Sequence, residues 1–391
     1  MTKSILFVDD EKQILRALKR LFIRSDYETY YAESGEMALQ ILEDHAIDLL
    51  ITDIRMPIMD GYELLRKVKE KYPLTLRVAL SGYTDNIKIY KALEDNIVKL
   101  YLFKPWNNDE LKTVIDKIFE QESILKDKNL LRLINNINDL PTVPNLYQEI
   151  AVLIESGADI DEISTKIEKD PAISSRILRV ANSAFYGTKT GSIKQAIIYI
   201  GLTSVKNIVL TNSVFKELKT GKEEKEMLWK HASLTNAYAN IIYSEFINKK
   251  MPSTFASAGL LHDIGKVVIY EHFSDEKNAA RAKVKDSDDM DTWEAEKEVL
   301  GVSHQEIGGY LLNWWELPFP IVEATLFHHN PTGENIINKE LVSVIHLANY
   351  YSWKKLGHEC LKNKLVEDVF EYLEIDKNEL ENFIEHFEIK I

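Results

Sequence analysis

The chain has one cysteine, Cys360, among its 391 residues. A single cysteine excludes a disulfide within the chain, which is typical of proteins from a reducing compartment. Long apolar runs are also missing: the longest segment without Asp, Glu, Lys or Arg is 231–244, shorter than the roughly 20 apolar residues of a membrane-spanning helix. The opening residues MTKSILFVDD are too short and too acidic a segment for a signal peptide. These absences predict a cytoplasmic protein with no membrane partner.

Positive charge is in deficit, because 48 Lys and Arg residues stand against 62 Asp and Glu residues, a net charge of −14. Nucleic-acid-binding proteins normally present a basic face, and the second half of this chain shows no basic recognition helix. We therefore expect no nucleic-acid partner. The length exceeds that of one hydrophobic core, which stops growing near ~250–300 residues, so two or three domains are expected.

Residues 1 to about 120 alternate short apolar runs with amphipathic stretches. The apolar runs lie at 5–8, 29–32, 49–52, 76–80 and 100–103. Between the first two runs, five residues fall on one helical face: Ile14, Leu15, Leu18, Leu21 and Phe22. Five such strand–helix units predict a parallel sheet covered on both faces, in which ligands bind beyond the carboxyl ends of the strands.

Polar residues follow four of these predicted strands: Asp9 and Asp10 the first, Asp53 the third, Ser81 the fourth and Lys104 the fifth. Each feature alone has a simpler reading, such as a solvated acidic pair or a surface turn, but their order along the pattern favours one crevice. Carboxylates gathered there repel one another unless a cation lies among them, and oxygen ligands suit Mg²⁺. Asp53 could then attack a phosphoryl group to form an acyl phosphate. Lys104 would pair with the phosphoryl oxygens, and Ser81 would donate a hydrogen bond to one.

Four segments resemble the receiver domain family of response regulators: VDDE at 8–11, TDIRMPIMDG at 52–61, LSG at 80–82 and FKP at 103–105. The resemblance implies a flavodoxin-like α/β fold with strand order 2-1-3-4-5. It also implies the role of each site residue: Asp53 as phosphoacceptor, Asp10 and the Arg55 backbone carbonyl as Mg²⁺ ligands, Asp9 as a ligand through water, Ser81 and Tyr101 as the switch pair, and Lys104 as the phosphate-binding lysine. A sensor histidine kinase would supply the phosphoryl group.

After Pro105 the pattern changes to helices with almost no strand signal. Asp170-Pro171 combines a helix cap with proline at the first helical position. Residues 111–138 predict one long connecting helix, which the prolines at 141 and 144 end. The expected division is a receiver at 1–121, a connecting helix at 122–138, an all-α output domain at 139–349 and a C-terminal helical extension at 350–391.

Histidines are scarce, ten in the whole chain, yet five lie in positions that indicate a site. They are His231, His262 beside Asp263, His304, and the pair His328-His329. An adjacent imidazole and carboxylate with a distant imidazole can form a mixed site for Fe, Mn or Zn, and such a metal can activate water for phosphoester hydrolysis. The His-Asp pair can equally be an internal hydrogen bond, with Gly265 ending a helix. Both readings stay open.

Residues 231–349 resemble the HD superfamily of metal-dependent phosphohydrolases. Three segments resemble its HDOD branch: LPTVPNL at 140–146, DPAISSRILRVANSAFYG at 170–187 and IKQAIIYIGL at 193–202. The resemblance implies an all-α signalling output module. It maps the superfamily's ligands to His231, His262 and Asp263, and places Asn349 where the superfamily normally has Asp. A neutral amide there would weaken metal affinity, while His304, His328 and His329 could serve a second metal.

The sequence as a whole predicts a two-component response regulator in which phosphorylation of Asp53 switches a helical HDOD output domain. The output would act by contact with an unknown downstream signalling protein, and homodimerisation is one route of response. The alternative is a metal-dependent HD-type phosphohydrolase acting on a nucleotide or cyclic dinucleotide. Against cyclic-di-GMP cleavage, the Gly-Tyr-Pro segment of that phosphodiesterase branch is absent from the sequence.

Overall fold

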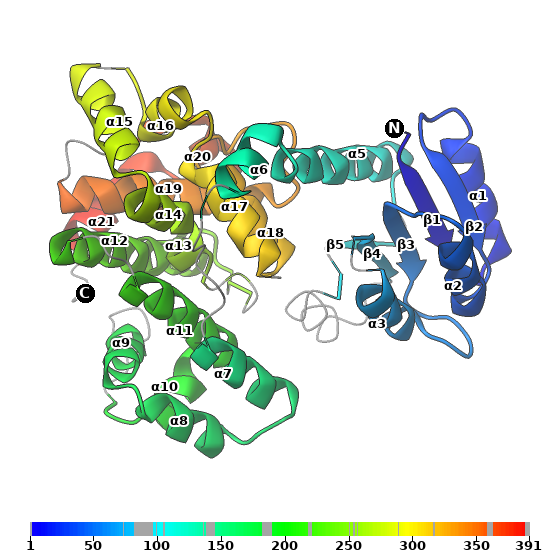
Figure 1. Cartoon of the computed structure of the whole chain (residues 1–391), viewed down its shortest axis with the longest axis horizontal. Helices are drawn as coiled ribbons and strands as arrows, with labels where there is room; N and C mark the ends of the chain where they lie inside the picture. The colour runs from blue at the N-terminus through cyan, green and yellow to red at the C-terminus, as the bar shows by residue number, and fades with distance from the viewer. Residues whose placement is uncertain are drawn as a thin grey trace. The chain divides into compact units, whose positions relative to one another are not determined.

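A computed structural model of the chain describes residues 2–72, 74–81, 97–98, 100–104, 106–135, 137, 145–181, 190–217, 221–249, 251–252, 255, 257–287, 289–315, 317–357 and 363–387. The chain folds as two compact units (Figure 1), the first formed mainly by residues 1–118 and the second mainly by residues 119–391. The first unit contains the sheet, and the second is built from helices.

The first unit is a parallel five-stranded sheet covered by helices. Its strands are β1 (Ser4–Val8), β2 (Glu28–Ala32), β3 (Leu49–Asp53), β4 (Leu76–Ser81) and β5 (Leu100–Phe103). They are hydrogen-bonded in the order β2-β1-β3-β4-β5, so the predicted flavodoxin-like order is confirmed. The register pairs Val8 with Thr52 and Asp53 with Leu80, which brings the carboxyl ends of neighbouring strands to one edge.

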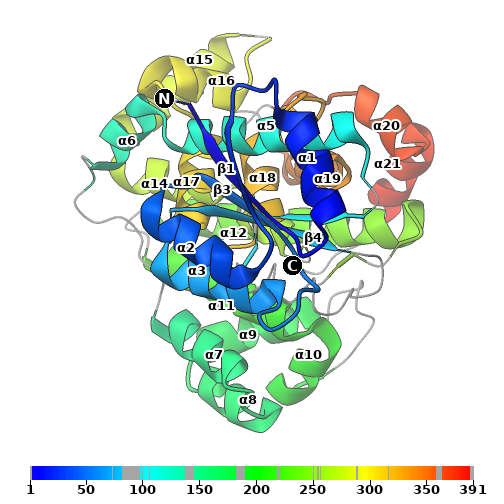
Figure 2. The same cartoon turned by 90° about the vertical axis from the view of Figure 1, so that its right-hand side faces the viewer.

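Helices α1 (Lys12–Phe22), α2 (Gly35–Asp44) and α3 (Gly61–Lys71) cover this sheet, and α5 (Asn108–Leu125) follows the last strand. Side chains alternate between the two faces of β1. Leu6 and Val8 pack in one core with residues of α2 and α3, whereas the Phe7 ring lies 5.1 Å from the Phe22 ring of α1. Figure 2 shows α1 on one side of the sheet and α2 and α3 on the other.

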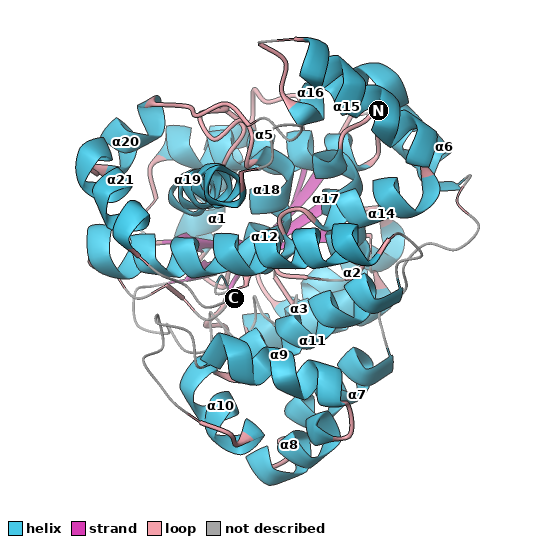
Figure 3. Cartoon of the chain, turned by 90° about the vertical axis from the view of Figure 1, so that its left-hand side faces the viewer, coloured by secondary structure: helices cyan, strands magenta, loops and turns pink. Residues whose placement is uncertain are grey.

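The second unit is all-helical across the residues that the structure describes, as predicted (Figure 3). Its helices are α6 (Lys128–Asn135), α7 (Asn145–Glu155), α8 (Ile160–Glu168), α9 (Pro171–Ala181), α10 (Ile193–Ile200), α11 (Leu202–Glu217), α12 (Lys222–Ile241), the π-helix η1 (Ile242–Phe246), α13 (Ala258–Leu261), α14 (Ile264–His272), α15 (Ser274–Asp286), α16 (Thr292–Leu300), α17 (His304–Trp314), α18 (Phe319–Phe327), α19 (Lys339–Leu356), α20 (Asp368–Leu373) and α21 (Lys377–His386). Helix α12 packs along α19 and α13, and α14 packs along α17. These pairings gather the candidate metal ligands.

The expected single connecting helix over residues 111–138 is wrong. Helix α5 ends at Leu125 and α6 begins at Lys128. Asp127 lies between them, and its Oδ1 accepts hydrogen bonds from the backbone N–H groups of Asn129 and Leu130, at 2.8 and 3.1 Å. An aspartate in this position caps a new helix start, which explains the break. The predicted start at Asp170 is confirmed, because Asp170 Oδ1 accepts from Ile173 N at 3.1 Å.

No single helix among the described residues is long and apolar enough to cross a membrane. The pair Ile193–Ile200 and Leu202–Thr211 reaches that length and composition only when both helices are taken together, and it bends by 111° between them. One face of this pair lies in the core, since Ile193, Ile197 and Val205 are buried.

Candidate functional site

The acidic and basic residues predicted for the receiver site lie at the carboxyl ends of β1, β3 and β5. Asp9 directly follows β1, Asp53 is the last residue of β3, and Lys104 directly follows β5. Lys104 Nζ lies 2.7 Å from Asp9 Oδ2 and 2.5 Å from Asp53 Oδ1. The parallel sheet thus brings these three residues together, because the carboxyl ends of its strands meet at one edge.

Burial and hydrogen bonding set the charges of this cluster. Burial raises the pKa of Asp9 above its usual value, and the hydrogen bond from Lys104 opposes that rise. Burial lowers the pKa of Lys104, but the hydrogen bonds to Asp53 and Asp9 outweigh burial and raise that pKa overall. The outer oxygens are held by the main chain: Asp9 Oδ1 accepts from Glu11 N and Asp53 Oδ2 accepts from Arg55 N, each at 2.9 Å. The charged Lys104 ammonium therefore lies between two carboxylates and forms an ion pair with each.

The receiver site was also predicted to include Asp10, Ser81 and Tyr101. Asp10 is exposed, and within the described part of the chain no hydrogen bond or ion pair joins it to Asp9, Asp53 or Lys104. The side chains of Ser81 and Tyr101 lie outside the described residues, so the switch pair stays a prediction. The groups at this edge that could bind a cation are carboxylates, and oxygen ligands are those that Mg²⁺ prefers.

Gly61 explains how α3 can begin directly against the end of β3. A Cβ atom at Gly61 would lie 2.1 Å from the Asp53 carbonyl oxygen, so only glycine allows this approach. The Gly61 N–H donates to Ile54 O at 2.9 Å, and Asp60 caps α3 by accepting from Glu63 N at 2.8 Å. This packing fixes the backbone that carries Asp53.

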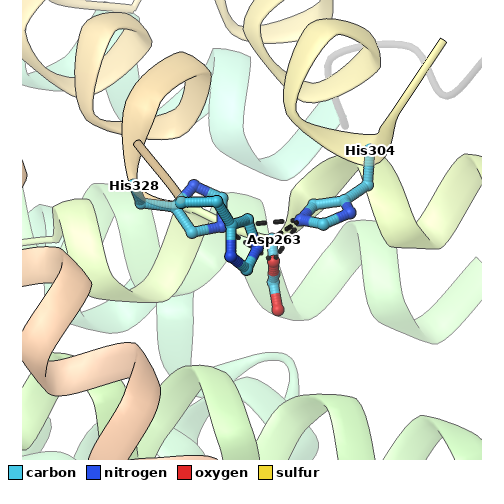
Figure 4. A group of neighbouring side chains, drawn as sticks. Asp263, His304 and His328 are labelled. Atoms are coloured by element: carbon cyan, nitrogen blue, oxygen red, sulfur yellow. Dashed lines mark hydrogen bonds and ion pairs between the residues drawn. The ribbon is translucent and has the colours of Figure 1, made fainter. Parts of the chain in front are cut away.

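In the second unit, five imidazoles surround the carboxylate of Asp263. His231 comes from α12, His262 and Asp263 from the junction of α13 and α14, His304 from the start of α17, and His328 and His329 from the end of α18. All six side chains are buried. Figure 4 shows His304 and His328 pointing toward Asp263. Two groups, each with its ligand atoms within 4.8 Å of one another, share Asp263: one with His231 and His262, and one with His304, His328 and His329.

The two oxygens of Asp263 face different halves of this cluster. Oδ2 lies 3.1 Å from His231 Nε2 and 3.4 Å from His262 Nε2. Oδ1 lies 3.2 Å from His304 Nε2 and 3.4 Å from His328 Nε2. Asn349 on α19 reaches the first half, where its Oδ1 lies 3.2 Å from His262 Nε2. His329 reaches the second half, with its Nε2 3.1 Å from His304 Nε2.

The outer nitrogen of each of four rings is held by a fixed partner. His231 Nδ1 lies 2.7 Å from Ser352 Oγ, His262 Nδ1 lies 2.8 Å from Gly259 O, His304 Nδ1 lies 2.6 Å from Glu296 Oε2, and His328 Nδ1 lies 2.9 Å from Thr325 O. Such partners orient the ring, and histidines that bind metals almost always have them. The rings are thus pre-oriented with Nε2 toward Asp263.

Burial also keeps most of these rings neutral. It lowers the pKa of His231 to about 3 and that of His262 and His328 to about 4. His304 differs: burial lowers its pKa, but the charge of Glu296 outweighs burial and raises it. Neutral imidazoles are the form that can bind a metal ion, and the first three rings are in that form at neutral pH.

The carboxylate at the centre is charged and incompletely satisfied. Burial acts to raise the pKa of Asp263, but the charge of Lys266 and the nearby imidazoles outweigh it and hold that pKa well below its usual value. Within the described residues, Asp263 Oδ1 accepts no hydrogen bond of good geometry. A buried anion with an unsatisfied oxygen beside neutral imidazoles fits a divalent metal of the Fe, Mn or Zn type.

Comparisons with known proteins agree with both units. The response regulator receiver domain family matches residues 5–116, and the HDOD domain family matches residues 140–331. The chain thus contains a response regulator receiver domain followed by an HDOD domain. The receiver–HDOD protein is 31% identical over 123 residues to the regulatory protein AtoC of Escherichia coli, covering 32% of this chain and 26% of that protein. It is 26% identical over 218 residues to an uncharacterized protein of Treponema pallidum, covering 55% of this chain and 42% of that protein.

The HDOD domain also resembles a solved structure. A crystal structure of an HDOD domain protein of unknown function from Geobacter sulfurreducens is 28% identical, with a TM-score of 0.51, and the match covers 67% of this chain and 88% of that chain. The receiver–HDOD chain spans less than half the length of AtoC and of the Treponema protein.

The second unit contains neighbours of the histidine cluster that sequence reasoning missed. Lys266 is buried with its Nζ 2.6 Å from Asp263 Oδ2, and Trp353 stacks on His231 with ring centroids 3.8 Å apart. The spacing of three residues between Asp263 and Lys266 on one helix was a signal for the first contact. Glu296, which is hydrogen-bonded to His304, could not be predicted as its partner, because the two residues lie on different helices and sequence spacing does not show that they meet.

Gly265 has a different role in the HDOD domain from the one considered as an alternative. It does not end a helix, because it lies in the first turn of α14. A Cβ atom at Gly265 would lie 1.9 Å from the His304 carbonyl oxygen. The missing side chain lets α14 and the start of α17 approach closely enough for Asp263 to reach His304.

Proposed function

We propose that a sensor histidine kinase phosphorylates Asp53 of this phosphorelay regulator and that the phosphorylated receiver switches the HDOD domain. The observation that carries this proposal is the Lys104 ammonium held between Asp9 and Asp53, at 2.7 and 2.5 Å. A cation in that position can bind the oxygens of a phosphoryl group on Asp53 through charge-assisted hydrogen bonds. Asp9, Asp10, Asp53 and the Arg55 backbone carbonyl would hold Mg²⁺, which screens the carboxylates from the incoming phosphoryl group.

The test is phosphorylation by a small phosphodonor, acetyl phosphate, with Mg²⁺. Wild type should be labelled and Asp53→Asn should not. Asp26→Asn is the matched control, because Asp26 is an exposed aspartate of the same domain outside the cluster. Equal labelling of Asp53→Asn and wild type would show that another residue accepts the phosphoryl group.

We further propose that the HDOD domain acts by contact with another signalling protein. The neutral Asn349 at a ligand position and the absent Gly-Tyr-Pro segment both support a signalling role over cyclic-di-GMP cleavage. The test is a pull-down with three samples of the chain: wild type treated with beryllofluoride, a phosphate mimic; untreated wild type; and Asp53→Asn. The proteins that each sample retains are compared. A partner retained equally by all three would contradict phosphorylation-dependent output. Gel filtration of the same samples measures whether homodimerisation is the response.

The second candidate function is a metal-dependent phosphohydrolase acting on a nucleotide or cyclic dinucleotide. The convergence of imidazole Nε2 atoms on Asp263 favours it, because a metal held there could activate water. The test is hydrolysis of nucleotides and cyclic dinucleotides by protein reconstituted with Mn²⁺ or Fe²⁺, with Asp263→Asn as the inactive control. Turnover that the substitution abolishes would favour the enzyme over the contact-based output.

A further inference from the structure

The two halves of the HDOD histidine cluster are similar in spacing. Four ligands arranged tetrahedrally about a metal at ~2.0–2.1 Å lie about 3.3 Å from one another. In the half around Asp263 Oδ1, the ligand separations are 3.1 Å for His304 to His329, 3.2 Å for His304 to Oδ1 and 3.5 Å for His304 to His328. In the half around Oδ2, they are 3.1 Å for both His231 to His262 and His231 to Oδ2. Geometry alone would therefore allow a metal in either half.

The Oδ2 half already contains a cation. Lys266 Nζ lies 2.6 Å from Oδ2, the side chain is 1% exposed, and its ammonium also lies 5.1 Å from the centre of the Trp353 ring. A divalent ion on the same oxygen would repel this ammonium in a poorly solvated interior. Moving the ammonium away would leave a buried charge without its partner, which is strongly destabilising.

Among the described residues, no lysine or arginine contacts Asp263 Oδ1, and the groups that could bind a metal in the Oδ1 half are stronger ligands. This half offers three imidazoles, whereas the Oδ2 half offers two imidazoles and the neutral amide of Asn349. His304 Nδ1 is hydrogen-bonded to the Glu296 carboxylate at 2.6 Å, whereas His231 Nδ1 is hydrogen-bonded to the Ser352 hydroxyl. A carboxylate partner makes an imidazole a better electron donor to a metal.

The charge of the cluster agrees with this asymmetry. Asp263 and Glu296 are acidic, Lys266 is basic, and an imidazole binds a metal ion in its neutral form, so the metal-binding form of the cluster carries one net negative charge before an ion is added. One divalent ion would change the net charge of these groups from −1 to +1. A second divalent ion would leave the buried cluster strongly positive, which is costly in a poorly solvated interior.

We propose that the HDOD cluster binds one divalent metal ion, held by Asp263 Oδ1, His304, His328 and His329, and that Lys266 takes the place of a second ion. This inference rests on the proposed capacity of the cluster to bind metal. It assigns the metal to the half that lacks Asn349, and it makes His231 and His262 supporting residues rather than ligands. The Lys266 ammonium acts as a fixed positive charge built into the site.

The experiment uses the full chain, stripped of metal by a chelator, reloaded with Co²⁺ and freed of excess ion by gel filtration. Cobalt per chain is measured by mass spectrometry, and the visible Co²⁺ spectrum reports coordination number. Wild type is expected to retain about one ion per chain. His304→Ala is expected to lower retention at least tenfold, and His231→Ala to leave it unchanged. Circular dichroism confirms that each variant is folded.

Lys266→Met supplies the decisive variant, because methionine keeps much of the side-chain volume without the charge. It is expected to raise retention from one ion toward two, while Lys285→Met, at an exposed lysine on α15, leaves retention unchanged. Two ions in wild type, or one ion lost with His231→Ala but kept with His304→Ala, would overturn the assignment while leaving metal binding intact. No retained cobalt in any variant would overturn metal binding itself. Asp53 labelling tests the receiver independently of both.

Discussion

Gln121 Nε2 donates a hydrogen bond to Glu323 Oε1 across 2.6 Å in the buried interior of the second unit. Glu323 is fully buried and also accepts from Ile337 N and from Asn338 N and Nδ2, at 2.6, 2.7 and 2.7 Å. Gln121 lies on α5, which belongs to the first unit up to Ile118. Glu323 lies in the middle of α18, and its backbone donors directly precede α19, so within the second unit this carboxylate joins the last part of α5 to both helices.

Removing this anchor should destabilise the HDOD domain. Gln121→Ala deletes a donor from Glu323 and a second hydrogen bond to Asn335 O, at 2.7 Å, so we expect the free energy of unfolding to fall by about 1–3 kcal/mol. Urea unfolding followed by tryptophan fluorescence measures the change. Glu120→Ala, at the exposed neighbouring position on α5, should stay within about 0.5 kcal/mol of wild type. Equal effects of the two substitutions would show that the contact contributes nothing specific.

Lys104 should couple phosphorylation to a change in conformation. Lys104→Ala keeps the Asp53 nucleophile but loses the ammonium that lies 2.5 Å from it, so some labelling should remain while the response is blunted. The measurement is protease sensitivity with and without beryllofluoride. Wild type and Lys71→Ala, at an exposed lysine that ends α3, should respond alike. If Lys104→Ala responds as wild type does, Lys104 is not part of the switch.

His346 should make the stability of the HDOD domain depend on pH. Its Nδ1 lies 2.8 Å from His328 O and its Nε2 accepts from Val366 N at 2.9 Å, so protonation would break the second contact. Burial lowers its pKa to about 4, against 6.5 for an ordinary histidine. The unfolded chain therefore binds the proton more readily, and the contribution of His346 is present above pH 6.5 and lost as the pH falls toward 4.

The size of this effect follows from linkage. Between those pH values, the free energy of unfolding should fall by up to about 1.4 kcal/mol per pH unit from this residue. Urea titrations at several pH values should show a shallower slope for His346→Gln than for wild type. His386→Gln, at an exposed histidine on α21, should keep the wild-type slope. An unchanged slope in His346→Gln would mean that His346 is not the group that titrates.

Gly265 should be intolerant of any side chain. In Gly265→Ala the new methyl would lie 1.9 Å from His304 O and 2.7 Å from Gly308 N, so α14 and α17 must separate at a cost of about 1–3 kcal/mol or more. Thermal unfolding should show a lower midpoint than in Gly191→Ala, where no atom lies within 4 Å of the added Cβ. Equal midpoints for both variants would show that the helix contact can relax freely.

The sequence predicted those parts of the molecule that depend on regular patterns. Asp9, Asp53 and Lys104 follow predicted parallel strands, and parallel strands place their carboxyl ends at one edge, so the order of residues along the chain was enough to indicate that they meet. The strand order itself came from resemblance, because apolar runs do not show which strands are neighbours. The break at Asp127 was missed because the apolar pattern continues past it, whereas the cap acts through a single side chain.

Contacts that depend on tertiary packing could not be predicted in the same way. The spacing in the HDIGK segment indicates that Lys266 can reach Asp263, but a lysine is normally exposed, so the segment does not indicate that both side chains are buried. Glu296 and His304 meet because α16 and α17 are joined by a short turn, and sequence spacing does not determine which way each helix faces. Pairing rules for one helix reach three or four residues and stop there.

The carbonyl groups of Gly259 and Thr325 determine which ring nitrogen of His262 and His328 carries the proton. A carbonyl oxygen only accepts hydrogen bonds, so neutral His262 and His328 must carry their proton on Nδ1, at 2.8 and 2.9 Å from these oxygens. Each ring then turns the lone pair of Nε2 inward, where another ring's Nε2 lies 3.1 or 3.5 Å away. Lone pairs directed inward make the centre electron-rich. Main-chain atoms, which no side-chain substitution removes, therefore fix the tautomer of both rings and direct their Nε2 lone pairs toward the centre.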